Sequence, residues 1–126
     1  MTADPSDGTA LFLDARLIWL ESNSPDQCIE RAKQNLEKLA PDDEIGHGRL
    51  LNLVGCALDE LKDWDQAAIW FEKAWKAHSS DPMYLSNLAE AHHKRGAKEE
   101  ASNAARLAKR SGATEKILDE ILGKKA

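Results

Sequence analysis

Residues 48–81 read GRLLNLVGCALDELKDWDQAAIWFEKAWKAHSSD, and residues 82–115 read PMYLSNLAEAHHKRGAKEEASNAARLAKRSGATE. The two stretches repeat each other at a spacing of 34 residues, because apolar or small residues recur at matching positions. These pairs are Leu51/Leu85, Val54/Leu88, Gly55/Ala89, Ala57/Ala91, Ala67/Ala101 and Ala74/Ala108. Self-similarity at a fixed period of this size indicates stacked supersecondary units instead of one closed core. The repeat therefore predicts an array whose surface binds other proteins.

The composition is that of a soluble globular protein with one domain. Hydrophobic residues make up 42% and charged residues 31% of the 126 residues. The net charge of -5 argues against nucleic-acid binding, and no segment approaches the roughly 20 apolar residues of a membrane helix. Residues 1–45 hold 10 acidic and 4 basic residues, so this part is either a solvated acidic surface or attracts a basic target.

The two cysteines predict a reducing compartment. Cys28 and Cys56 fall in the middle of predicted helices and form no metal-binding pair, so we interpret them as small, partly buried apolar residues. The apolar run 11–20 is interrupted by Asp14 and Arg16, and no basic start with a small-residue cleavage site accompanies it. A signal peptide is therefore not predicted, and the expected location is cytoplasmic.

Capping and helix-breaking residues divide the chain into seven predicted helices with no strand. Residues 1–8 are polar and are expected to form a disordered N-terminus, followed by a first helix over 9–21. In that helix Leu13, Leu17 and Leu20 recur at the spacing of one helical face. Start signals for the later helices stand near residues 24, 42, 63, 81, 96 and 114. The expected stripe of the third helix is Leu50, Leu51, Val54, Ala57, Leu58 and Leu61, and that of the last is Ile117, Leu118, Ile121 and Leu122.

Residues 48–81 resemble the tetratricopeptide repeat. The positions that carry the resemblance are Leu51, Val54, Gly55, Leu58, Trp64, Ala67, Phe71 and Ala74. Residues 82–113 match the pattern less well, residues 9–41 look like a degenerate first repeat, and residues 114–124 resemble the capping helix that closes such arrays. The resemblance implies an all-α fold, a short right-handed α-α superhelix of three helical hairpins plus a cap, as a single domain over 9–126.

The resemblance also implies a binding face, because the first helix of each pair lines the concave side of such arrays. On the matched register, these inward-pointing residues are Arg49, Asn52, Cys56, Asp59, Glu60, Met83, Ser86, Glu90, His93 and Lys94. An extended or helical segment of a partner protein is the expected ligand. The alternative is that these residues are merely solvated and that contacts use the convex side or the ends.

One subgroup of the family binds acidic carboxy-terminal peptides through Lys and Asn at set positions of successive first helices. This chain offers Asn52, but Cys56, Ser86 and Glu90 occupy places where that clamp needs Asn or a basic group. The resemblance therefore disfavours a receptor for chaperone tails.

No catalytic arrangement, cofactor or metal is predicted. The adjacent pair His92 and His93 projects about 100° apart on a helix and cannot chelate one ion, so His92 is interpreted as a packing residue. Neither a phosphate-binding Gly-rich loop nor a nucleophile with its base is present in the sequence. Trp70 and Trp75 cannot both share the face of Phe71, so at least one is expected to be partly exposed and to be a candidate subunit contact.

The prediction for function is a small adaptor that binds a protein segment on its concave face without chemistry of its own. One alternative is a chaperone for a secreted or assembling client, because the chain resembles small three-repeat secretion chaperones in size and layout. Another is a self-assembling scaffold and homo-oligomer, for which the tryptophans and the apolar last helix are the reasons.

Overall fold

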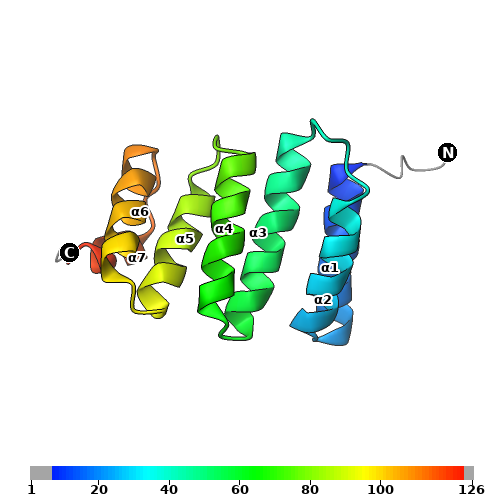
Figure 1. The fold of residues 1–126 in the computed structure, drawn as a ribbon, viewed down its shortest axis with the longest axis horizontal. Coiled ribbons are helices and arrows are strands. Elements are labelled where there is room, and N and C mark those ends of the chain that lie inside the picture. Colours follow the sequence, from blue (N-terminus) through cyan, green and yellow to red (C-terminus); the bar gives the residue numbers. More distant parts are fainter. Residues whose placement is uncertain (1–6, 124–126) are drawn as a thin grey trace.

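The computed structural model describes residues 7–123, which form seven helices and no strand. The helices are α1 (Gly8–Ser22), α2 (Pro25–Leu36), α3 (Glu44–Glu60), α4 (Trp64–Ala77), α5 (Met83–Lys94), α6 (Lys98–Arg110) and α7 (Lys116–Ile121). Figure 1 shows them in chain order along the long axis, from α1 and α2 at one end to α6 and α7 at the other. The predicted all-α solenoid is confirmed. None of the described helices is long and apolar enough to cross a membrane.

The helices begin close to the predicted starts, and side-chain caps begin α1 to α4. The hydroxyl of Ser24 accepts a hydrogen bond from the Gln27 amide at 3.3 Å, and the carboxylates of Asp43 and Asp63 cap α3 and α4 in the same way. At the amino-terminal end the prediction needs correction, because Asp7 caps α1 and Gly8 is its first residue. These two residues belong to the folded part, whereas residues 1–6 of the predicted disordered N-terminus lie outside the described residues.

The turns of the three helical hairpins have one feature in common. The residue that reverses the chain has a positive φ in each of them: 52° at Asn23, 62° at Lys62 and 81° at Gly96. Such left-handed conformations cost little for Gly, and Asn tolerates them better than most residues. The turn between α1 and α2 has two residues, whereas the turns between α3 and α4 and between α5 and α6 have three.

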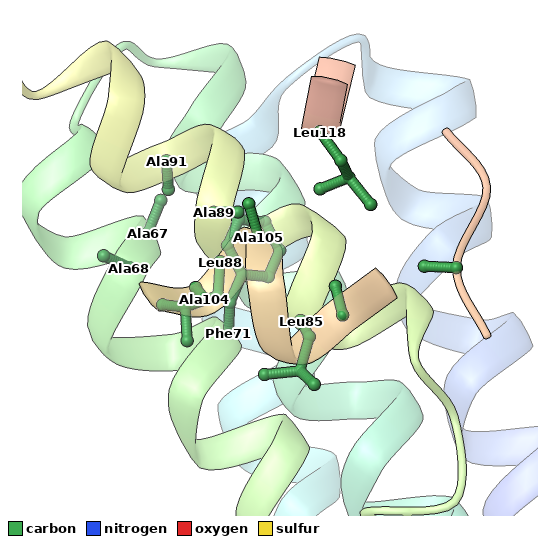
Figure 2. Packing of buried hydrophobic residues seen from close by; sticks show 12 residues of the cluster. Ala67, Ala68, Phe71, Leu85, Leu88, Ala89, Ala91, Ala104, Ala105 and Leu118 are labelled. Carbon is green, nitrogen blue, oxygen red and sulfur yellow. The ribbon is translucent and has the colours of Figure 1, made fainter. Parts of the chain in front are cut away.

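Small side chains set the close spacing of the helices. A Cβ atom added at Gly55 of α3 would lie 2.6 Å from the ring of Phe71 in α4. Within the second and third hairpins, Ala67, Ala89, Ala101, Ala105 and Ala108 are fully buried. Figure 2 shows Ala67, Ala89 and Ala105 of this set among the larger Phe71, Leu85, Leu88 and Leu118. Interiors pack densely only when large and small side chains interlock in this way.

The face of α1 that carries the leucine spacing is exposed. Leu13, Leu17 and Leu20 are 50%, 51% and 69% exposed, whereas Leu11 and Ala15 of the same helix are buried. Adding 40 to the α1 numbers aligns the helix with α3, so Leu13 and Leu17 match Leu53 and Ala57, which are 6% and 0% exposed. In α3, Leu53 packs in the cluster that includes residues of α1 and α2. No helix precedes α1 in the described part of the chain, so Leu13 and Leu17 lie on a packing face that no described helix covers, whereas Leu20 matches the exposed Glu60.

Of the other predicted stripes, that of α3 requires a small correction and that of α7 is confirmed. In α3 the buried residues include Leu53, which the prediction omitted, whereas Leu61 is 42% exposed at the end of the helix. In α7, Leu118 is fully buried, and Ile117, Ile121 and Leu122 pack against the same cluster. The apolar last helix therefore turns inward and offers little surface for self-assembly. All four tryptophans are half-buried, Trp70 and Trp75 included.

A polar cluster joins α1 to α2. Asn35 is fully buried, and its amide nitrogen donates to the Leu11 carbonyl and to the Asp14 carboxylate, both at 2.9 Å. Arg31 pairs with the same carboxylate at 3.0 Å. The hydrogen bond from Asn35, with that from Arg31 and its charge, lowers the pKa of Asp14 against the opposing effect of burial.

This cluster predicts an acid-dependent loss of stability. A carboxyl with a folded-state pKa below its unfolded value of 3.8 stabilises the fold above that pH, and the contribution disappears as pH falls through the folded pKa. We expect Asp14→Asn to lower the free energy of unfolding at pH 6, and we expect the difference from wild type to shrink as pH falls below 3.8. Urea titrations of both proteins at pH 6 and at successively lower pH values measure the free energy of unfolding. Asp26→Asn, an exposed substitution on α2 that leaves Asn35 and Arg31 untouched, is the control, and an equal pH response from both variants would contradict the assignment.

Candidate functional site

A hollow of about 430 Å³ lies between α1 and α3, the first helices of the first two hairpins. It is lined by Phe12, Arg16, Trp19, Leu20, Asn23, Asn52, Leu53 and Cys56. Most of this lining is apolar, and the polar groups are one guanidinium and two carboxamides. A concave, mainly apolar surface with a few polar groups is the usual form of a site that holds a ligand side chain.

The apolar wall of the hollow is held in place by packing. Phe12 and Trp19 are partly buried against the cluster of α1, α2 and α3, and the guanidinium of Arg49 lies 4.4 Å from the centre of the Phe12 ring. This cation–π contact between α3 and α1 holds the Phe12 ring in place. Leu20 remains 69% exposed at the rim.

Asn52 and Cys56, both predicted for the binding face, do lie at the hollow. The carboxamide oxygen of Asn52 accepts a hydrogen bond of 2.9 Å from Asn87 of α5, so the side chain also links two hairpins. Its amide nitrogen lies 3.8 Å from the Cys56 sulfur. Burial, followed by the charge of Asp59, raises the pKa of the Cys56 thiol to about 11, so it is a neutral, weakly polar part of the wall at pH 7.

Three further predicted residues form an ion network next to the hollow. The ammonium of Lys94 lies 2.9 Å from the Asp59 carboxylate and 3.5 Å from that of Glu90. Burial acts to lower the pKa of Lys94, but the hydrogen bond and charge of Asp59, with those of Glu90, outweigh it and raise the pKa. Lys94 is therefore paired with these two carboxylates. Together the three side chains carry a net negative charge at this end of α3 and α5.

The other predicted residues differ in how accessible they are. Glu60, Met83 and His93 are exposed, but none of them lines the hollow. Ser86 is the exception to the expected inward-pointing set, because it is 4% exposed and its hydroxyl donates to the Pro82 carbonyl at 3.4 Å. A hydroxyl turned back onto its own helix offers no surface to a ligand.

The α1 half of the hollow was missed by the sequence prediction. Matching Ala32, Leu36 and Leu39 to Ala67, Phe71 and Ala74 gives an offset of 35 residues, which places Leu20 opposite Gly55 and makes the first helix look degenerate. The correct offset for this helix is 40 residues, so that Ala15 matches Gly55 and Phe12 and Arg16 match Asn52 and Cys56. The signal that could have found it is Ala15, a small residue four after Leu11, as Gly55 is four after Leu51.

The arrangement of helices agrees with that of a known fold. The chain is similar to the first TPR of Spaghetti (RPAP3), solved bound to the HSP90 peptide SRMEEVD, with a TM-score of 0.76. The similarity covers 96% of this chain and 94% of that one, at 15% sequence identity. This chain has the tetratricopeptide repeat fold. No protein-family profile matches the sequence, and no curated protein sequence matches it.

Within the tetratricopeptide repeat fold, the hollow and the ion network both belong to the first helices of the hairpins. Among the described residues, no group of three or more His, Cys, Asp or Glu side chains stands close enough to hold a metal ion. The chemistry that the first helices offer is therefore apolar contact, hydrogen bonding through carboxamides and charge pairing through Arg16.

Proposed function

We propose that this protein is a peptide-binding module that holds a segment of a partner protein in the hollow between α1 and α3, without catalysis. The observation that carries the proposal is the hollow itself, about 430 Å³ with an apolar lining from Phe12, Trp19, Leu20 and Leu53. A volume of this size takes one or two large apolar side chains of a bound segment. The adaptor role that we predict follows from such binding.

The polar groups indicate how the segment is oriented. Arg16 at the hollow is suited to a carboxylate or a main-chain carbonyl of the ligand, whereas Asp59, Glu60 and Glu90 make the neighbouring stretch of α3 and α5 acidic. The similar RPAP3 domain holds a peptide with an acidic end. The hollow described here instead favours an apolar anchor, followed toward α5 by a neutral or basic residue.

Leu20→Glu tests this proposal with little risk to folding, because the side chain is 69% exposed. A charge at the rim opposes entry of apolar side chains, so we expect peptides selected on the wild-type protein from a random display library to bind the variant at least about tenfold more weakly. Isothermal titration calorimetry of the selected peptides measures the change.

The matched control is Leu61→Glu, the same substitution at a side chain that is 42% exposed outside the hollow. It is expected to leave the affinity of the selected peptides unchanged. Equal affinity of those peptides for wild type and Leu20→Glu would contradict the proposed site.

A further inference from the structure

A second apolar groove lies away from the hollow, between α4 and α6, the second helices of the second and third hairpins. It measures about 380 Å³, and α5 forms its floor. The apolar lining consists of Trp75, Leu85, Leu88, Ala104 and Leu107. None of these residues lines the hollow between α1 and α3, so the two sites are separate.

The preceding pair of second helices, α2 and α4, shows what fills such a groove. There Trp70 of α4 packs against the cluster of α1, α2 and α3, with the Lys33 ammonium of α2 at 5.2 Å and that of Lys73 at 4.4 Å from the ring centre. One repeat later, 34 residues after Trp70, stands Ala104. A methyl group thus replaces an indole, which leaves the space between α4 and α6 open.

Ala104 is firmly placed in the third hairpin. It is 8% exposed, and Figure 2 shows it among the side chains of the cluster that Phe71 and Leu88 also join. Leu107, one turn further along α6, is 39% exposed and stands at the edge of the groove. Apolar surface is therefore available there, on a rigid wall.

The charges at the groove are predominantly negative. Glu72 of α4 and Glu100 of α6 stand on the two walls, and Lys76 lies 3.7 Å from Glu72. His92 lines the groove as well. Its pKa is lowered by burial and by Arg95, against the opposing charges of Glu100 and Glu72, so it is neutral at pH 7. Two carboxylates face one ammonium at the groove, and the Arg95 guanidinium beside His92 is paired with Asp65 at 2.7 Å. This balance favours a ligand with positive charge.

We propose that the groove between α4 and α6 binds an aromatic side chain of a partner protein that is flanked by basic residues. The aromatic ring takes the place that Trp70 fills in the preceding repeat, over Leu85 and Leu88, and the basic residues approach Glu72 and Glu100. This mirrors the internal arrangement of Trp70 between Lys33 and Lys73. The inference does not depend on the peptide site between α1 and α3.

The experiment uses three short peptides as probes of the full chain: acetyl-Lys-Trp-Lys-amide, acetyl-Lys-Ala-Lys-amide and acetyl-Glu-Trp-Glu-amide. In ¹H–¹⁵N NMR titrations we expect the first to shift the amide signals of Leu88, Ala104 and Leu107 saturably, with a dissociation constant in the millimolar range or below. The acidic peptide is expected to bind about tenfold more weakly. The alanine peptide is expected not to saturate.

Two variants tie binding to the groove. Ala104→Trp fills the groove with the side chain that the preceding repeat carries, and is expected to abolish binding of the Lys-Trp-Lys peptide. Leu107→Ala, at a side chain already 39% exposed, removes one wall without a core change and is expected to weaken binding at least threefold. Because Leu107→Ala is not expected to destabilise the protein, it tests the proposal even if Ala104→Trp is poorly folded.

Three outcomes would overturn the proposal. One is equal binding of the Lys-Trp-Lys and Glu-Trp-Glu peptides, and another is unchanged binding by Leu107→Ala. The third is a wild-type dimer in analytical ultracentrifugation that Leu107→Ala dissociates, since the occupant would then be a second copy of this chain. Loss of peptide binding at the hollow through Leu20→Glu leaves this groove unaffected, so failure of one site is distinguishable from failure of the other.

Discussion

Gly55→Val is expected to destabilise the protein by about 3 kcal/mol, because α3 and α4 cannot move apart locally. An added Cβ would stand 2.6 Å from two ring carbons and 3.1 Å from a third carbon of Phe71. That ring is 3% exposed and is held in the cluster that joins α4, α5 and α6, so it has no free direction in which to turn. The higher helix propensity of Val over Gly recovers only a few tenths of a kcal/mol. Urea or thermal unfolding followed by circular dichroism measures the loss.

Ala10→Val is the control for Gly55→Val. It places the same side chain at an exposed position of α1 and is expected to cost no more than about 0.6 kcal/mol. Gly55→Val combined with Phe71→Leu is expected to cost less than the sum of the two single changes, because the smaller side chain relieves the overlap. If Gly55→Val unfolds at the same denaturant concentration as Ala10→Val, close packing at this point is not what holds the hairpin together.

Leu118→Ala is expected to cost about 2–5 kcal/mol and to release α7 from the array. The helix has six residues, too few to be stable in isolation, and Leu118 is its fully buried side chain. An ion pair between Lys109 and Asp119 also tethers it, but that pair is partly exposed and contributes little beside the lost burial. Hydrogen exchange detects the result as lost protection of the amides from 118 to 122.

Glu120→Ala is the matched truncation on the exposed side of α7. We expect it to leave the protection of α7 and the free energy of unfolding within about 0.5 kcal/mol of wild type. Retained protection of these amides in Leu118→Ala would show that α7 docks by other contacts than this side chain.

The second hairpin was the most predictable element of the molecule. Gly55, Ala67, Phe71 and Ala74 stand at spacings that only a tightly packed helix pair satisfies, and the structure buries all four. Helix caps such as Ser24 were equally predictable from the sequence, because their hydrogen bonds join residues that are close in the chain. Asn52 and Cys56, which were predicted for the concave side, line the hollow, and their part in binding stays a prediction.

The first hairpin was less predictable because it differs in length from the others. Its turn and the following connection shift α1 by 40 residues relative to α3, so a single period hides the match of Ala15 to Gly55. The leucine spacing of α1 was correctly assigned to one helical face, but spacing alone does not say whether a neighbour covers that face. The α1 side of the hollow, including Arg16 and Trp19, therefore emerged only from the structure.

By itself the sequence determined the helices, their hairpin pairing and their stacking, because caps, turns and the 34-residue period act between residues close in the chain. The tertiary structure alone decided which apolar faces stay open. Leu17 is exposed because no described helix precedes α1, and the groove at Ala104 is open because the space between α4 and α6 lacks the indole that fills the space between α2 and α4. Whether an apolar side chain is exposed depends on helices that are distant in the chain. A local sequence pattern does not show whether such a helix covers it.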